Sequence, residues 1–179
     1  GVLGGLFAAL IAPLIFDWAY EHPLLVLAAA LLLPLPALFP WDKWLKLSPA
    51  TTRVVVALMI AVAAFASWKM ASEWTGQVEG SVAIWGALLF AIGMLVIGWR
   101  WAYVPVLALL MIGVGGWDTL QESVAGMRVR SYFGVYTVTD DPYRHQRRLA
   151  HGTTLHGLQR TDRGHELEPT TYYGHQSGV

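Results

Sequence analysis

The chain has 179 residues, of which 55% are hydrophobic and only 13% are charged. Soluble domains carry about a quarter charged residues, so this composition indicates a membrane protein. Twelve Lys and Arg residues balance twelve Asp and Glu residues, and the lack of a basic excess argues against nucleic acid as a partner. The sequence contains no cysteine, which excludes disulfides, thiolate metal ligands and cysteine nucleophiles.

The composition changes near Met127. Residues 1–127 are mostly apolar, whereas in residues 128–179 only 15 of 52 are apolar, and five of the six histidines lie there. We therefore expect a transmembrane helical region over residues 1–127 and a water-exposed module over residues 128–179. The sequence begins with Gly1 rather than Met and ends in Ser177-Gly178-Val179, so we expect a fragment at both ends.

Five apolar runs follow one another in the first region and are separated by short segments that hold nearly all its charges. They are Leu3–Phe16, Leu24–Phe39, Val54–Trp68, Val82–Trp99 and Trp101–Gly116. Since a spanning helix needs about 20 residues, the runs predict a bundle of about four to five transmembrane helices, the first of them truncated. Tryptophans cluster at the ends of the runs, as in an aromatic belt at the headgroups. No run contains an ionisable residue, so the runs give no support to an ion-coupled transporter.

Two local signals define helix ends. Ser48 followed by Pro49 is typical of a helix start, with Ser as the cap and Pro in the first turn, and predicts a helix from Pro49 to about Trp68. Pro34 and Pro36 predict that the second helix ends early or kinks.

The basic residues do not fix the orientation in the membrane. Three of them between residues 40 and 53 favour a cytoplasmic position for that loop. Arg128 and Arg130 favour the same side for the segment after the last run, although three crossings separate the two. The side on which the polar module lies therefore stays open.

The second region has the pattern of a small antiparallel β meander. Residues 131–138 are rich in aromatic and β-branched residues, and residues 139–142 form a turn signal. Two further strands are expected over residues 143–151 and 153–160, separated at Gly152. So few apolar residues cannot form an independent core, so the module must pack against something else.

Several short segments resemble membrane-fused spermidine synthase-like proteins of bacteria. They are Phe133-Gly134-Val135, His151–Gln159, Pro169–Gly174 and Ser177–Val179. The resemblance implies a multi-helix membrane region followed by the β-rich N-terminal lid of a spermidine synthase-like domain. In the family a Rossmann-like catalytic domain follows and binds decarboxylated S-adenosylmethionine as co-substrate, and we expect this chain to be a fragment that lacks it.

The resemblance also implies substrate-binding residues. In the soluble enzymes an Asp-Gly pair followed closely by Gln, and a later Tyr, contact the substrate. Gln159 matches that Gln, and Tyr172 or Tyr173 matches the Tyr, while His151-Gly152 or His156-Gly157 stands where Asp-Gly is expected. Because His replaces Asp and no His-Glu follows the Tyr, the amine substrate is not fixed as putrescine.

Two functions from different classes remain. The first is a membrane-anchored aminopropyltransferase of polyamine biosynthesis, integral to the bacterial inner membrane and acting on a polyamine or another amine, with a homo-oligomer as one option for its assembly. As a fragment it would be inactive and hold no cofactor, and its catalytic residues are not identified. The second is a membrane carrier or scaffold whose tail binds a polyamine or a partner protein without catalysis. The dense histidines match no zinc spacing, so no metal site is expected.

Overall fold

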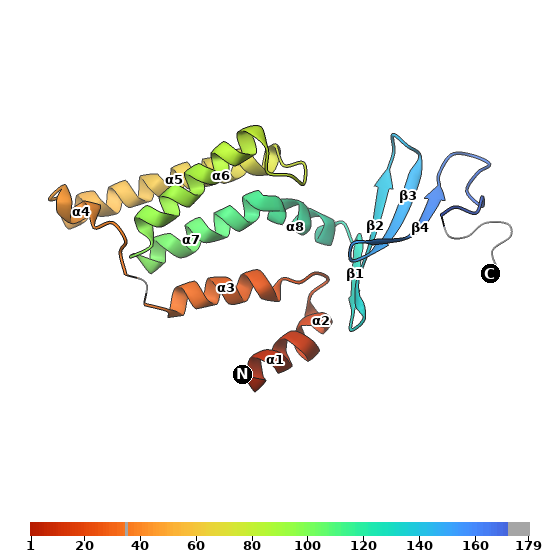
Figure 1. The fold of residues 1–179 in the computed structure, drawn as a ribbon, viewed down its shortest axis with the longest axis horizontal. Helices are drawn as coiled ribbons and strands as arrows, with labels where there is room; N and C mark the ends of the chain where they lie inside the picture. The colour runs from red at the N-terminus through yellow and green to blue at the C-terminus, as the bar shows by residue number, and fades with distance from the viewer. Residues whose placement is uncertain (35, 172–179) are drawn as a thin grey trace. The chain divides into compact units, whose positions relative to one another are not determined.

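The computed structural model describes residues 1–34 and 36–171. Figure 1 shows helices over the first part of the chain and four strands after them, which confirms the expected combination of a mainly helical region with a small antiparallel sheet. The described residues form two compact units. The helical unit comprises residues 22–120, and the sheet unit joins residues 1–21 to the residues from Gln121 onward.

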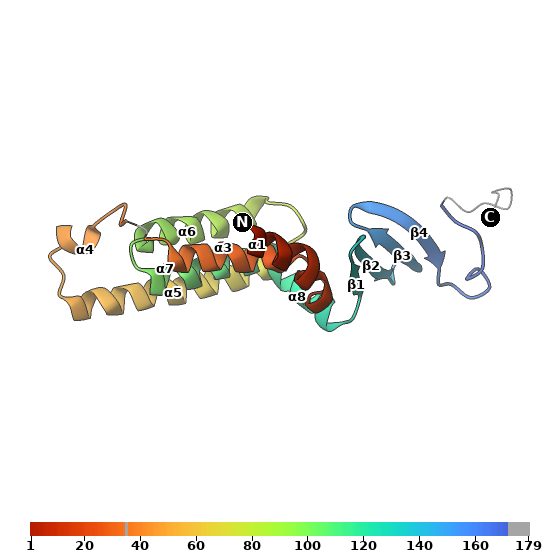
Figure 2. The same ribbon diagram turned by 90° about the horizontal axis from the view of Figure 1, so that it is seen from below.

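The helical unit is built around three helices that pack side by side. Its elements are α3 (Glu21–Leu32), α4 (Trp41–Trp44), α5 (Pro49–Ser72), α6 (Gly80–Val96), α7 (Arg100–Met111), the short π-helical segment η2 (Ile112–Gly116) and the start of α8 (Trp117–Val124). Figure 2 shows α5, α6 and α7 running alongside one another. Gly115 interrupts the helical backbone with a φ of 75°, so the chain kinks between α7 and α8.

Small side chains allow these helices to approach closely. The buried residues of the core are Val56, Ala63, Ala66 and Met70 of α5, Val82, Leu89, Ile92 and Val96 of α6, and Ala102 and Val106 of α7. A Cβ atom at Gly113 would lie 3.1 Å from Sδ of Met70, so glycine makes room for that side chain. The Ser67 hydroxyl donates a hydrogen bond of 2.6 Å to the Leu109 carbonyl, which satisfies a buried polar group.

The start of α5 is where the sequence predicts it. The Ser48 side chain accepts a hydrogen bond of 3.1 Å from the Thr51 N–H, and Pro49 occupies the first turn. The helix continues four residues beyond the predicted end at Trp68, to Ser72. Near this end of the helix Lys69 and Glu73 form an ion pair of 2.7 Å. The hydrogen bond from Lys69 is the main reason why the pKa of the Glu73 carboxyl is lowered.

Two helical stretches, Pro49–Ser72 and Arg100–Val124, the second of them kinked at Gly115, are long and apolar enough to cross a membrane. Only 28% and 11% of their most apolar stretches are buried, whereas the core helix of a soluble protein would be mostly buried. The other apolar helices, Val2–Ile15, Glu21–Leu32 and Gly80–Val96, are shorter. The structure thus has two helices of spanning length, fewer than the four to five expected, in part because α3 ends at Leu32, ahead of Pro34.

Trp41 departs from the expected aromatic belt. Its side chain is only 9% exposed, its Nε1–H donates a hydrogen bond of 2.9 Å to the Leu95 carbonyl, and its ring packs edge-on against Trp99 at 5.4 Å. A buried indole with a satisfied N–H is a core residue. Trp44, Trp68 and Trp101 remain more than half exposed, as residues of a belt would be.

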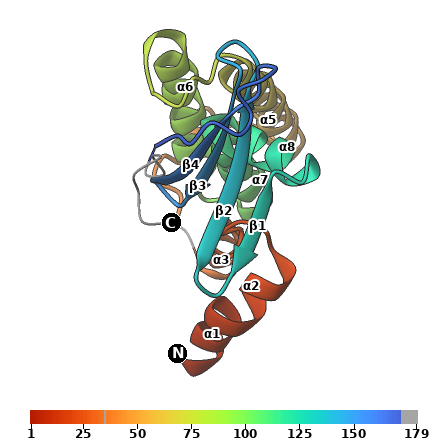
Figure 3. The ribbon, with the colours of Figure 1, turned by 90° about the vertical axis from the view of Figure 1, so that its right-hand side faces the viewer.

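The sheet unit combines a short helical segment with the four strands. The helical segment contains α1 (Val2–Leu6), the π-helical turn η1 (Phe7–Ile11) and α2 (Ala12–Ile15). The strands are β1 (Arg128–Ser131), β2 (Gly134–Asp141), β3 (Gln146–His151) and β4 (Thr154–Arg160). They pair antiparallel in chain order, which confirms the predicted meander, and α2 contacts β1 (Figure 3).

The first predicted strand was wrong in its bounds. Residues 131–138 do not form one strand, because the chain turns back at Tyr132-Phe133 and thereby creates β1, which the sequence did not indicate. Gly134 permits this turn with a φ of 136°. The following turn begins at Pro142 rather than at residue 139, because Asp140 and Asp141 pair in register with β3.

Candidate functional site

Three residues that the sequence predicted to bind substrate, His151, His156 and Gln159, lie on one face of the sheet. Directly paired residues share a face, and so do residues two apart on one strand. We call this surface the open face; its members are Val129, Tyr136, Val138, Asp140, Arg147, Leu149, His151, Thr154, His156, Gly157 and Gln159. Its residues are exposed or half-buried, and Val129, Val138 and Leu149 are 66%, 38% and 39% exposed.

A β-bulge places His156 on this face. The pairing of β3 with β4 shifts between Leu149 and Ala150, so that Leu149 pairs with Gly157 while Ala150 pairs with Leu155. His156 is the extra residue of this bulge, so its side chain does not follow the alternation between the two faces along β4. Its ring lies 5.5 Å from the ring of His151, which confirms that both histidines occupy the same side of the sheet.

His151 is held firmly by its neighbours. Its ring stacks on Tyr136 with 4.4 Å between centroids and 9° between planes, and its Nε2 lies 2.9 Å from the Phe133 carbonyl oxygen. A carbonyl oxygen can only accept, so the His151 Nε2 donates this hydrogen bond. A Cβ atom at Gly134 would collide with this ring. His151 thus fixes the β1–β2 hairpin, a structural role that the sequence did not indicate.

Gln159 is exposed at the other end of the open face. Its Nε2 donates a hydrogen bond of 3.3 Å to the Glu166 carbonyl, and it pairs in register with Arg147. Arg147 in turn holds Asp140 through two contacts of 2.6 and 3.2 Å. These hydrogen bonds lower the pKa of Asp140 and raise the pKa of Arg147. Asp140 is therefore an ionised, paired carboxylate rather than a ready proton acceptor.

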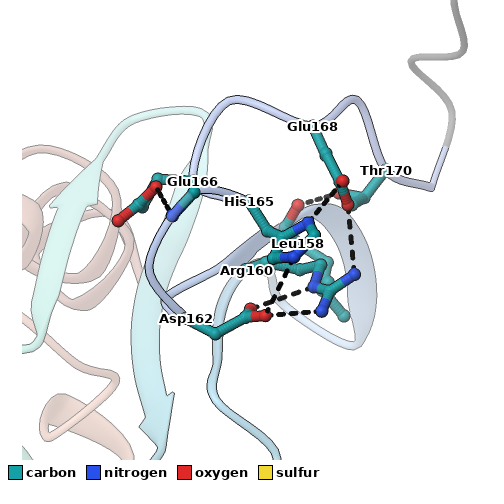
Figure 4. Close-up of polar contacts among 8 residues, drawn as sticks. Leu158, Arg160, Asp162, His165, Glu166, Glu168 and Thr170 are labelled. Atoms are coloured by element: carbon teal, nitrogen blue, oxygen red, sulfur yellow. Dashed lines mark hydrogen bonds and ion pairs between the residues drawn. The ribbon is translucent and has the colours of Figure 1, made fainter.

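The segment after β4 folds back through a network of charged side chains, shown in Figure 4. Arg160 contacts Asp162 at 2.5 and 3.0 Å and Glu168 at 3.1 Å, and His165 Nδ1 donates to Glu168 at 2.5 Å. The Thr170 hydroxyl donates to the Leu158 carbonyl. The carboxylates of Asp162 and Glu168 thus hold residues 161–170 against β4.

Acid should release this segment. The hydrogen bond from Arg160 lowers the pKa of Asp162, and the hydrogen bond from His165 lowers the pKa of Glu168. A lowered folded-state pKa contributes stability above the unfolded pKa and loses it as pH falls through the folded value. The protection factors of residues 161–170 in hydrogen exchange, which correct for the pH dependence of the intrinsic exchange rate, should therefore be high near neutral pH and fall below about pH 4.

The matched variants for this pH experiment are Glu168→Gln and Glu166→Gln. Glu168→Gln removes the carboxylate that Arg160 and His165 share, so the segment should exchange faster already at neutral pH. Glu166 accepts from the Gly164 N–H at 2.9 Å, and its replacement should leave the acid-dependent step in place. Protection factors that stay constant in the unsubstituted protein as the pH falls below about 4 would contradict this interpretation.

Strand β1 is anchored to the start of the chain by a buried ion pair. Arg130 binds Glu21 in a bidentate manner, at 2.7 and 2.8 Å, and also donates at 2.6 Å to the Trp18 carbonyl. The Glu21 side chain is 3% exposed, and its hydrogen bonds raise the pKa of Arg130. Arg128 lies over the Trp18 ring at 4.3 Å and pairs with Glu122, and burial lowers its pKa. Both arginines, interpreted from sequence as membrane-flanking charges, are packing residues.

Two of the residues predicted from the sequence have no described position. Tyr172 and Tyr173 lie outside the described residues. Within residues 1–34 and 36–171, no three His, Asp or Glu side chains gather as metal ligands would. No protein-family model, no curated protein and no solved structure matches the chain.

Proposed function

We propose that this chain is the membrane anchor and β-rich lid of a spermidine synthase-like aminopropyltransferase of the bacterial inner membrane. In this proposal the open face of the sheet lines the amine site, with His156 and Gln159 contacting the substrate and His151 shaping the face. The domain that binds decarboxylated S-adenosylmethionine, implied by the resemblance, would lie over that face.

The observation that carries the proposal is the gathering of His151, His156 and Gln159 on one exposed face. These residues come together because β3 and β4 form a hairpin and because the bulge brings His156 to the same face as His151. An exposed face that mixes aromatic rings, an amide and apolar side chains suits an elongated amine, since rings attract ammonium groups and the amide oxygen accepts from them.

The chemistry assigns the open face a positioning role. In aminopropyl transfer, the nitrogen of a neutral amine attacks the carbon next to the sulfonium sulfur; the N–C bond forms, the C–S bond breaks and methylthioadenosine leaves. The nitrogen then gives up a proton to a base. Asp140 is already paired with Arg147, so it would not serve as this base. In this proposal the open face orients the amine, and the base belongs to the co-substrate domain.

The helices supply the anchor. We propose that Pro49–Ser72 and Arg100–Val124 span the membrane, and that α3 and α6 lie between them as shorter embedded helices of the expected four-to-five-helix region. The exposed apolar side chains of α5 support this placement: Val54, Leu58 and Phe65 are 60%, 61% and 53% exposed.

The test is an assay of the full-length protein in detergent with decarboxylated S-adenosylmethionine and a panel of amines, following methylthioadenosine release. Gln159→Ala should lower kcat/KM about tenfold to hundredfold, the effect of losing one hydrogen bond to a charged group. Gln77→Ala, the same change at an exposed loop residue of the helical unit, is the matched control and should leave kcat/KM unchanged.

The opposite result would favour the other class of function. If folded full-length protein released no methylthioadenosine with any amine, the aminopropyltransferase proposal would be wrong. The open face would then belong to a membrane carrier or scaffold, and its binding of polyamines could be measured directly by calorimetry. The firm structural role of His151 is the observation that favours this second candidate.

A further inference from the structure

The turn between β1 and β2 carries two exposed aromatic rings at one end of the sheet. They belong to Tyr132 and Phe133, whose side chains are 60% and 86% exposed. We call these two residues the aromatic tip. The β2–β3 turn, which contains Tyr143, lies at the opposite end of β2. Exposed rings alone do not identify a partner, so the surroundings of the tip must do so.

The aromatic tip lies beside the apolar helical segment at the start of the chain. The Tyr132 hydroxyl donates a hydrogen bond of 3.4 Å to the Leu10 carbonyl, and α2 contacts β1. Figures 1 and 3 show the β1–β2 hairpin next to this segment. Both belong to the sheet unit, so the tip and the exposed side chains of the segment form one apolar surface.

The exposed side chains of this helical segment point in several directions. Consecutive residues of a helix point about 100° apart. Both members of three consecutive pairs are nevertheless exposed: Val2 and Leu3, Leu10 and Ile11, and Leu14 and Ile15. A protein partner covers one stripe of a helix, whereas lipid surrounds it. Because residues 1–16 also contain no charged side chain, hydrocarbon is the partner that this surface fits.

The change from apolar to charged residues occurs at matching positions in the helical segment and in β1. The first charged residue of the chain is Asp17. Beside it along the chain, the Trp18 carbonyl accepts from Arg130 of β1, and Arg128 lies over the Trp18 ring. The charged part of β1 thus lies at the charged end of the segment, and the tip lies at Leu10. Trp is typical of the headgroup level, so the tip lies on the hydrocarbon side of that level.

We propose that the aromatic tip inserts into the bilayer interface beside the first helical segment. Leu10 lies five residues before the end of α2, a rise of about 7–8 Å, which matches the thickness of one headgroup layer. Since the Phe133 carbonyl accepts from His151, insertion would hold that end of the open face next to the headgroups. The inference rests on the membrane anchor of the proposed function and does not depend on aminopropyl transfer.

The experiment is site-directed spin labelling of the full chain in vesicles of phosphatidylethanolamine and phosphatidylglycerol. The chain contains no cysteine, so each variant carries a single label. Oxygen concentrates in the bilayer and a nickel chelate in water, so the ratio of their collision rates with the label reports its depth. The label in Phe133→Cys should show a several-fold higher ratio than the label in Tyr143→Cys. Tyr143 is the matched control because it is an aromatic residue, 97% exposed, at the opposite turn.

A third label separates failure of this inference from failure of the anchor. Leu58 of α5 is exposed and belongs to a helix that we propose to span the membrane. A high ratio in Leu58→Cys, together with equal low ratios in Phe133→Cys and Tyr143→Cys, would leave the anchor in place and overturn insertion of the tip. A low ratio in Leu58→Cys would overturn the anchor and this inference together.

The mobility of the label distinguishes lipid from a protein partner. Phe133→Cys keeps the backbone carbonyl that binds His151, so the hairpin should fold as in the unsubstituted protein. An immobile label at this position, reached by neither oxygen nor the nickel chelate, would show that protein covers the tip and would overturn the assignment to lipid.

Discussion

Arg130→Met is expected to lower the free energy of unfolding of the sheet unit by about 3–5 kcal/mol, the usual cost of leaving one member of a buried ion pair alone. The reason is the position of Glu21, whose carboxylate is 3% exposed and receives both Arg130 nitrogens at 2.7 and 2.8 Å. Without Arg130 this carboxylate must lose its charge or unfold its surroundings. Limited proteolysis of the strands during denaturant titration in detergent measures the effect.

Two further variants isolate the ion pair. Glu21→Leu combined with Arg130→Met should recover most of the lost stability, because an apolar pair leaves no buried charge behind. Arg163→Met is the matched control: Arg163 is exposed in the segment after β4, and its loss should change the unfolding free energy by less than about 0.5 kcal/mol. If Arg130→Met and Arg163→Met changed the free energy of unfolding by the same amount, the anchoring role of Arg130 would be contradicted.

Gly134→Ala is expected to cost about 2–4 kcal/mol, from backbone strain and overpacking together. The backbone at Gly134 has a φ of 136°, a conformation that side chains rarely tolerate. In addition, the new Cβ atom would collide with the His151 ring, which donates to the Phe133 carbonyl and stacks on Tyr136. Denaturant unfolding followed by the near-ultraviolet signal of the aromatic residues measures the loss.

A double-mutant cycle separates the two causes. In the His151→Ala background the collision is gone, so Gly134→Ala should cost less there than in the unsubstituted protein. Gly152→Ala is the matched control, since Gly152 also has a positive φ, 58°, but a Cβ atom at that position would meet nothing within 4 Å. If Gly134→Ala cost no more than Gly152→Ala, His151 would not close the hairpin as described.

The features that the sequence predicted correctly depend on neighbouring residues. The cap at Ser48 and the proline at position 49 act within one helical turn, and α5 begins where they indicate. The meander likewise follows from strand-forming segments separated by short turns, although Gly134 and Pro142 moved the turn positions. Helix length was harder to predict, because hydropathy marks an apolar run but not where the helix ends: α6 ends at Val96, whereas its apolar run continues to Trp99.

The candidate site shows the same division. Sequence alone selected His151, His156 and Gln159, but whether they share a face depends on strand register, and a one-residue bulge decides it for His156. The carboxylates of Asp162 and Glu168 bind Arg160, the last residue of β4, and the contact with Glu168 depends on how the following segment folds back onto that strand.

The sequence by itself determined the apolar helices, the presence of a polar antiparallel module after them and the start of α5, since composition, periodicity and capping act over a few residues. Only the tertiary structure decided the partners of the buried charges and the register of the open face. Arg130 and Glu21 are 109 residues apart, and no local pattern specifies which two distant groups will meet. Their pairing is set by how the chain folds back, because a charge removed from water must find its counterion wherever packing places it.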